Sequence, residues 1–158
     1  MKRTIRTLSL ILLWVQTGNA QGFFEKISQN EWKGSGELLK RSASFQMDWR
    51  PILDGKFYEL SFQNQQDASK EYRFKSKGIY RPWENGTFTG TWFDSRGYSF
   101  PLKGKFTENE LIVYWGNPET EEGKTTYRIK DNGTVSVIDY ILKDGKLIPF
   151  GNALYQKP

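Results

Sequence analysis

The fold class follows from residues 42–50, which read SASFQMDWR. Apolar side chains occupy every second position of this stretch, at Ala43, Phe45, Met47 and Trp49, and polar side chains lie between them. Alternation with a period of two is typical of a β-strand that has one face buried and the other in water. Residues 42–50 therefore predict a strand whose aromatic face points into a core.

The same alternation recurs on both sides of this stretch, from Trp32 to Tyr155. Turn residues separate about ten such segments, and no helical pattern lies between them. An open antiparallel sheet of this length would expose two edge strands, whereas a closed barrel has none. The sequence therefore predicts an all-β fold, an antiparallel up-and-down barrel of about ten strands. Gly78 is expected to form a bulge that resets the alternation of its own segment.

Residues 1–20 have the properties of a signal peptide. Three basic residues precede an apolar stretch at residues 8–15, which is too short to span a bilayer, and small residues follow it. The alternative, a helix of the mature protein, lacks an amphipathic pattern that continues past residue 20. Cleavage before Gln21 would leave one barrel domain, residues 21–158, exported to the periplasm or the extracellular space.

Residues 21–31 lack the alternation of the rest of the chain. Phe23, Phe24 and Ile27 lie at spacings i, i+1 and i+4, which suits a single helical turn laid over one end of the barrel. A loose N-terminal arm is the alternative, and the sequence favours neither over the other.

Two absences exclude several kinds of site. The chain has no His and no Cys, so it can form no Ser-His-Asp triad, no Cys-His pair, no His-ligated zinc site and no His-ligated haem. Glu119, Glu121 and Glu122 share one acidic loop, but they lack the fixed ligand spacing of calcium loops. We therefore expect a solvated loop, no metal site and no cofactor.

The charge of the chain excludes a further class of partner. Loss of the signal peptide reduces the 23 basic residues to 20, against 18 acidic residues, and these charges are spread along the chain. Nucleic-acid binding requires a clustered basic face, so we expect no nucleic-acid partner. No later apolar stretch is long enough to anchor the chain, so we do not expect an integral membrane protein.

Two short motifs carry a family resemblance. Residues 32–36 (WKGSG) and 88–92 (FTGTW), with hairpin spacing over most of residues 32–157, resemble the calycin superfamily, which includes lipocalins, fatty-acid-binding proteins and nitrobindins. The chain looks closest to small exported bacterial lipocalin-like domains with no assigned activity. This resemblance implies an up-and-down barrel that binds apolar ligands.

The chain departs from this family in two ways. Nitrobindin-like barrels hold haem through a His, which is missing here, so haem bound in that way is not expected. Fatty-acid-binding proteins hold a carboxylate with an Arg-x-Tyr pair on an interior strand. The one such pair in this chain is Arg96-Gly97-Tyr98, which lies at a turn, so the carboxylate clamp is not carried over.

A barrel of about ten strands is wider than an eight-stranded one, whose side chains can just fill the interior, so a ligand cavity is expected. Aromatic rings would give contact area, and the polar tips of Tyr and Trp would give direction. The alternative for each candidate is a place in a plain packed core. The candidates for the cavity are Phe45, Met47, Trp49, Tyr58, Phe62, Tyr72, Phe74, Phe88, Trp92, Trp115, Tyr127 and Asp139.

Asp139 is the polar member of this set. If it shares the inner face with Val135 and Val137, its carboxylate must find a hydrogen-bond donor or take up a proton, and it could orient a ligand or act as an acid or base. A shift of one residue would instead turn Ile138 and Tyr140 inward and leave Asp139 in water. The sequence favours this second register.

Three functions are compatible with these observations. The first is an exported, non-enzymatic barrel that binds a small hydrophobic or amphipathic molecule. The second is a barrel enzyme that uses Asp139 with a Tyr as acid and base. The third is an envelope interaction protein with a solid core.

Overall fold

The computed structural model describes residues 22–28, 30–66 and 73–158. The prediction of a signal peptide falls on residues 1–20 and lies outside the described residues. One helix and ten strands make up the described part of the chain: α1 Gly22–Ile27, β1 Glu31–Leu38, β2 Arg41–Ile52, β3 Phe57–Gln66, β4 Arg73–Pro82, β5 Thr87–Asp94, β6 Ser99–Phe106, β7 Glu110–Gly116, β8 Glu122–Ile129, β9 Val135–Lys143 and β10 Lys146–Gln156.

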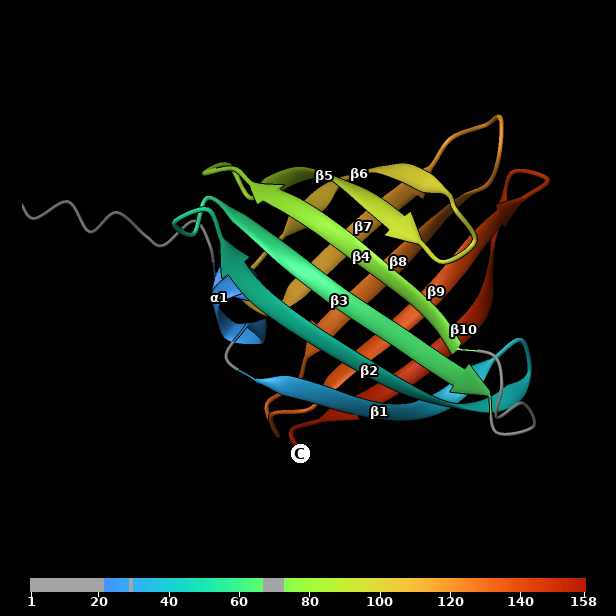
Figure 1. The fold of residues 1–158 in the computed structure, drawn as a ribbon, viewed down its shortest axis with the longest axis horizontal. Coiled ribbons are helices and arrows are strands. Elements are labelled where there is room, and N and C mark those ends of the chain that lie inside the picture. The colour runs from blue at the N-terminus through green and yellow to red at the C-terminus, as the bar shows by residue number, and fades with distance from the viewer. Residues whose placement is uncertain (1–21, 29, 67–72) are drawn as a thin grey trace, which may run out of the picture.

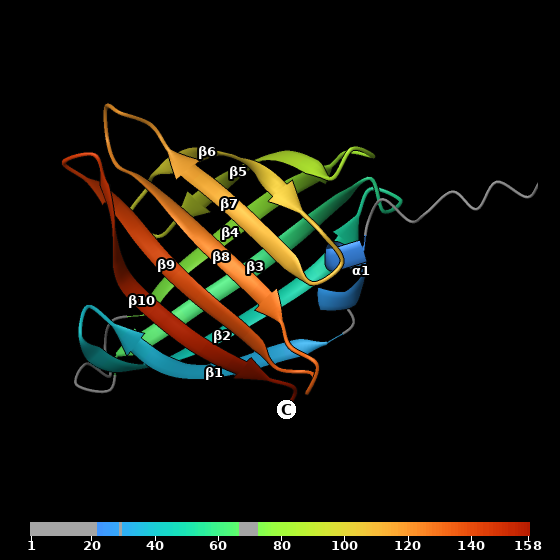
Figure 2. The same cartoon turned by 180° about the vertical axis from the view of Figure 1, so that it is seen from behind.

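These strands form a closed antiparallel barrel, as the alternation predicts (Figures 1 and 2). Each strand pairs with the next along the chain, and β10 pairs with β1 to close the barrel. The closing pair runs from Lys33 opposite Gln156 to Leu38 opposite Gly151. Because β1 and β10 pair, their backbone N–H and C=O groups bond to each other, and the described sheet has no free edge.

The strand at residues 42–50 is the central part of β2, and its inner face is as expected. Ala43, Phe45, Met47 and Trp49 are all buried, and the side chains between them are exposed or half-buried. Tyr58 and Leu60 are buried on the inner face of β3 in the same way. The period of two therefore identifies the inner face of both strands correctly.

The expected bulge at Gly78 is wrong. The β4 strand pairs without a register shift with β3 on one side and β5 on the other. Gly78 lies on the inner face of a regular strand, and the ring of Tyr80 occupies the space that a side chain at residue 78 would need. A Cβ atom at residue 78 would lie 2.6 Å from Tyr80 Cε2. The described sheet has its irregularity between Pro149 and Gly151 of β10 instead.

The α1 helix closes one end of the barrel, so the helical alternative for the N-terminal segment is correct (Figure 1). Phe23, Phe24 and Ile27 are completely buried. Phe24 enters a cluster of rings, with its ring centroid 5.0 Å from that of Tyr58 and 5.1 Å from that of Phe106. The described residues contain no helix with the length and apolar character needed to cross a membrane.

A hydrogen bond and an ion pair hold the C-terminal end of α1 against the barrel. The indole Nε1–H of Trp32 donates to the carbonyl oxygen of Ile27 over 2.8 Å, which satisfies an end carbonyl of the helix. Lys26 Nζ lies 2.6 Å from the Glu108 carboxylate in the turn between β6 and β7. The position of α1 is therefore fixed by contacts with the start of β1 and with the turn after β6.

Candidate ligand-binding cavity

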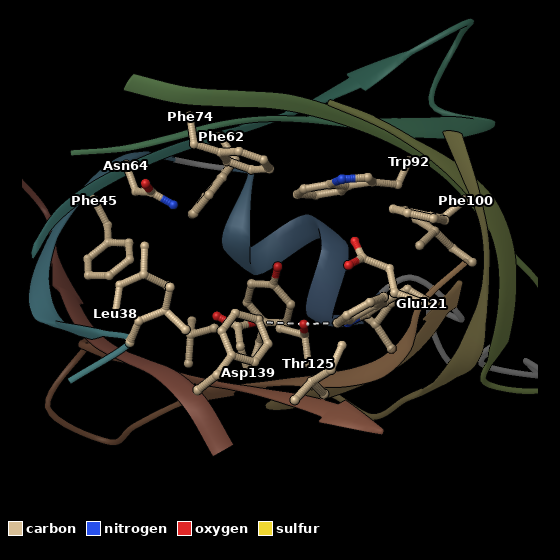
Figure 3. A pocket seen from close by; sticks show the side chains of 18 of the residues that line it. Leu38, Phe45, Phe62, Asn64, Phe74, Trp92, Phe100, Glu121, Thr125 and Asp139 are labelled. Carbon is tan, nitrogen blue, oxygen red and sulfur yellow. Dashed lines mark hydrogen bonds between the residues drawn. The ribbon is translucent and has the colours of Figure 1, made fainter. Parts of the chain in front are cut away.

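The part of the barrel interior away from α1 is hollow, with a cavity of about 600 Å³ (Figure 3). The lining reaches from Tyr80, Tyr127 and Tyr155 inside the barrel to Leu39 in the turn between β1 and β2. Leu39 is 66% exposed, so the cavity reaches the surface at this end. In Figure 3 the view runs into the cavity, and α1 lies behind it.

The structure places seven of the twelve candidate residues on the cavity: Phe45, Phe62, Phe74, Trp92, Trp115, Tyr127 and Asp139. Tyr72 lies outside the described residues. The other four, Met47, Trp49, Tyr58 and Phe88, belong to the buried core and do not line the cavity.

The cavity prediction is wrong for these four residues because α1 fills the space in front of three of them. The Phe24 ring lies 5.9 Å from Trp49, 5.0 Å from Tyr58 and 6.0 Å from Phe88, measured between ring centroids. Met47 is buried in the same cluster. The interior is thus divided into a filled end under α1 and a hollow end away from it.

Aromatic side chains form much of the cavity wall. The Phe62 ring is central on one side, with centroid distances of 6.4 Å to Phe45, 6.3 Å to Phe74 and 6.2 Å to Trp92. Phe62, Phe74 and Trp92 lie on the wall opposite Asp139 in Figure 3. Broad, weakly polar ring surfaces of this kind suit an apolar molecule.

Asp139 points inward, so the register favoured by the sequence is wrong. Val135 and Val137 are buried on the inner face of β9, Asp139 and Ile141 continue that face onto the cavity, and Ile138 is exposed. The sequence is ambiguous here because β9 is apolar on both faces. Exposed Ile138 faces water together with Leu154 of the neighbouring strand, so hydrophobicity does not identify the inner face.

A short chain of hydrogen bonds holds the Asp139 carboxylate. Trp115 Nε1–H donates to Thr125 Oγ1 over 3.2 Å, and the Thr125 hydroxyl donates to Asp139 Oδ1 over 2.6 Å (Figure 3). Burial raises the pKa of Asp139 to about 6, and the bond from Thr125 only partly opposes this effect. Near neutral pH the cavity therefore contains a carboxylate that is mostly ionised.

Three tyrosines lie near Asp139, within the range of its electrostatic field. Burial raises the pKa of Tyr80, Tyr127 and Tyr155, and the Asp139 charge raises each of them further. All three phenols therefore stay protonated across the physiological range and can act as hydrogen-bond donors.

Arg96 is at the rim of the cavity and is held by two carboxylates. Its Nη2 lies 2.7 Å from Asp94 Oδ2 and 2.6 Å from Glu121 Oε1, so it links the β5–β6 turn to the loop before β8. Its guanidinium carbon lies 5.6 Å from the Phe74 ring centroid and 5.0 Å from that of Tyr98. Burial alone would raise the pKa of Asp94, but hydrogen bonds and charge from Arg96 outweigh it and leave that pKa lowered.

Sequence reasoning missed several residues of the cavity. Phe100, Leu102 and Val113 line it from β6 and β7, where the alternation was a usable signal. Tyr80 was hidden by the expected bulge at Gly78. Arg96 gave no signal, because an Arg in a polar turn is common on any surface.

No metal site is apparent in the part of the chain that the structure describes, where no group of three or more possible carboxylate ligands comes together. Glu121, from the acidic loop, is paired with Arg96 at the rim. The cavity lining contains two acidic side chains, Glu121 and Asp139, and one basic side chain, Arg96.

Comparison with known proteins supports the fold alone. No protein-family model matches the chain, and no curated protein matches it. Among solved structures, the chain is similar to Rv2717c from M. tuberculosis, with a TM-score of 0.66 and 14% sequence identity, over 89% of this chain and 98% of that one. At this level of identity, the likeness shows that the two chains share a barrel fold.

Proposed function

We propose that this protein is an exported, lipocalin-like barrel that binds a small hydrophobic or amphipathic molecule in its cavity and performs no chemistry on it. The observation that carries the proposal is the hollow of about 600 Å³ at one end of a barrel whose other end is filled. Ligand pockets are typically about 300–1,000 Å³ in volume and mostly apolar, with a few polar groups.

The arrangement of the wall supports this proposal. A packed core would bring the ring of Trp115 into contact with the rings of Phe62 and Trp92 across the interior, as Phe24 contacts Trp49 at the other end. At the hollow end, these three rings are only partly buried and face the cavity. Covering this apolar surface with a ligand would remove it from water and stabilise the complex.

A neutral hydrophobic dye such as Nile red tests the proposal. The unaltered protein should raise the fluorescence of the dye in a saturable way, and Val137→Phe, which projects a ring into the cavity, should weaken binding by about tenfold or more. Ile138→Phe, at the next position on the outer face of β9, is the matched control and should bind the dye normally. Equal loss in both variants, or no binding by the unaltered protein, would refute the proposal.

An acid–base enzyme is the second candidate, and one observation favours it. The pKa of Asp139 is raised to about 6, close to the range in which a general base works best. However, the tyrosines that would serve as its partner have raised pKa values and are poor proton donors in catalysis. Asp139→Asn would abolish turnover of an apolar substrate under this alternative.

Export can be tested separately from binding. We propose that residues 1–20 are removed and that the mature chain starts at Gln21. Intact-mass measurement of the protein recovered from its host should show the mass of residues 21–158. A full-length mass would contradict export through a cleaved signal peptide, and it would leave the binding proposal unaffected.

A further inference from the structure

Asp139 lines the cavity, and one of its two carboxylate oxygens accepts a hydrogen bond from a described side chain. Thr125 donates to Oδ1, and no other side chain within the described residues hydrogen-bonds to this carboxylate. The second oxygen lies beside Gly151, where a Cβ atom would be 3.3 Å from Oδ2. Residue 151 itself adds no side chain beside Oδ2, but Leu38 borders this position, because the same Cβ atom would lie 3.5 Å from Leu38 Cδ1.

The hydrogen bonds of Thr125 fix it as a donor to Asp139. The Trp115 indole can only donate, so it occupies an acceptor site on Thr125 Oγ1 and leaves the hydroxyl proton for Asp139. The carboxylate is therefore oriented by the protein but remains short of donors. Buried ionised carboxylates normally pair with a cation or accept several hydrogen bonds.

No cation of the described chain serves this carboxylate. Arg96 is the basic residue of the cavity lining, and it is bound at the rim by Asp94 and Glu121. The described polar groups that act on Asp139 are Thr125 on β8, which donates to it, and the three protonated tyrosines in its field, and all four are neutral. The interior therefore carries a negative charge that nothing in the described structure neutralises.

We propose, on the basis of the binding function above, that the cavity selects cationic amphiphiles, with the ligand's ammonium group on Asp139 Oδ2 and its apolar tail against the Phe62 and Trp92 wall. A protonated primary amine supplies both the positive charge and the N–H donors that the carboxylate lacks. A fatty acid placed in the same way would bring two carboxylates together in an apolar site, which is strongly unfavourable. A fatty acid at the rim would meet an Arg96 whose positive charge is already offset by Asp94 and Glu121.

Three ten-carbon probes test this selectivity: decylamine, decanol and decanoate, each used below its micelle concentration to displace Nile red. At pH 7.5 the amine should bind about tenfold or more tightly than the alcohol, and the carboxylate most weakly. In Asp139→Asn the amine should lose its advantage over the alcohol. Asp48→Asn, which removes the same charge from the outer face of β2, should retain the amine preference.

The pH dependence of the unaltered protein gives an independent readout. Decylamine stays protonated from pH 5 to 8, and the three tyrosines near Asp139 stay neutral. The preference for amine over alcohol should therefore decline as pH falls through about 6, where Asp139 takes up a proton. This pH series on the unaltered protein tests the role of Asp139 even if Asp139→Asn fails to fold.

The outcomes separate the two proposals. If neither Nile red nor decanol binds, the cavity-binding function itself is refuted. If both bind but the amine has no advantage, the selectivity for cations is overturned and hydrophobic binding stands. If the amine keeps its advantage in Asp139→Asn or at pH 5, the assignment of that selectivity to Asp139 is overturned.

Discussion

Asp139 lowers the stability of the folded protein at neutral pH. Its pKa is about 6 in the folded state, above the ordinary value of 3.8, because burial disfavours the charged form. Between these two values the folded protein holds a proton that the unfolded chain has released. The free energy of unfolding should therefore fall as pH rises from about 4 to 6, and the penalty should persist above that range.

Asp139→Asn should consequently stabilise the protein at pH 7.5, by up to about 3 kcal/mol, and have little effect near pH 4. The measurement is the free energy of unfolding in urea at both values of pH. Asp48→Asn controls for the loss of one negative charge. A stabilisation of equal size at pH 4 would show that the effect does not come from the ionisation of Asp139.

For single residues, the sequence predicts which residue types line the site, but not in every case whether a side chain faces the interior or the solvent. Phe45 was placed correctly because its strand is polar on the other face. Asp139 was misplaced because β9 carries exposed Ile138 and Leu142 on its outer face, which mimic a buried face. The position of Arg96 depends on an ion pair with Glu121, 25 residues away, which no local pattern records.

Among the elements, α1 determines how much of the interior is available. It has six residues, and such a short helix is stable only through tertiary contacts. Those contacts come from Phe23, Phe24 and Ile27, which are fully buried at the end of the barrel. The helix therefore acts as part of the core and packs behind Tyr80 and Tyr127, which line the inner end of the cavity.

Phe24→Ala should reduce the free energy of unfolding by about 3–5 kcal/mol, because it removes a ring that is fully buried among aromatic neighbours. Lys26→Ala is the control from the same helix. It breaks an exposed ion pair with Glu108, which should matter by less than about 1 kcal/mol. Urea unfolding of both variants checks the prediction, and similar losses in the two would mean that Phe24 does not anchor the helix.

Two strands, β2 and β4, show when the alternation of apolar residues predicts a strand correctly and when it does not. The β2 strand was recognised because large apolar residues mark its inner face. The β4 strand was misread because Ser76 and Gly78 occupy inward positions between Phe74 and Tyr80. A small residue at an inner position leaves room for a neighbouring ring, and the alternation of apolar residues is then interrupted although the strand is regular.

For the whole molecule, closure between β1 and β10 is the feature on which the barrel depends. Removal of residues 151–158 would delete the part of β10 that pairs with β1. This truncation should expose strand edges at β1 and β9 and lead to aggregation. Removal of residues 157–158, which follow β10, should leave a soluble barrel. Size-exclusion chromatography with circular dichroism distinguishes the two, and a soluble, folded 1–150 chain would show that closure is dispensable.

The closed barrel could be predicted because edge pairing is a property of the strands as a set. The division of the interior into a filled and a hollow end could not be predicted, because it depends on where a six-residue helix docks. The two readings of residues 21–31, a cap or a loose arm, lead to cavities of different depth. Only the placement of Phe24 among Trp49, Tyr58 and Phe88 decides between them.

Because α1 closes one end of the barrel, a ligand of the proposed binding function has to enter and leave through the open end, beside Leu39 and Arg96. An elongated ligand could not pass from one end of the barrel to the other, so the end that enters first would also leave last. Under the proposed function, the outer end of the ligand would stay at this opening. A ligand fixed by that end to a bead, a surface or another macromolecule should therefore still be captured.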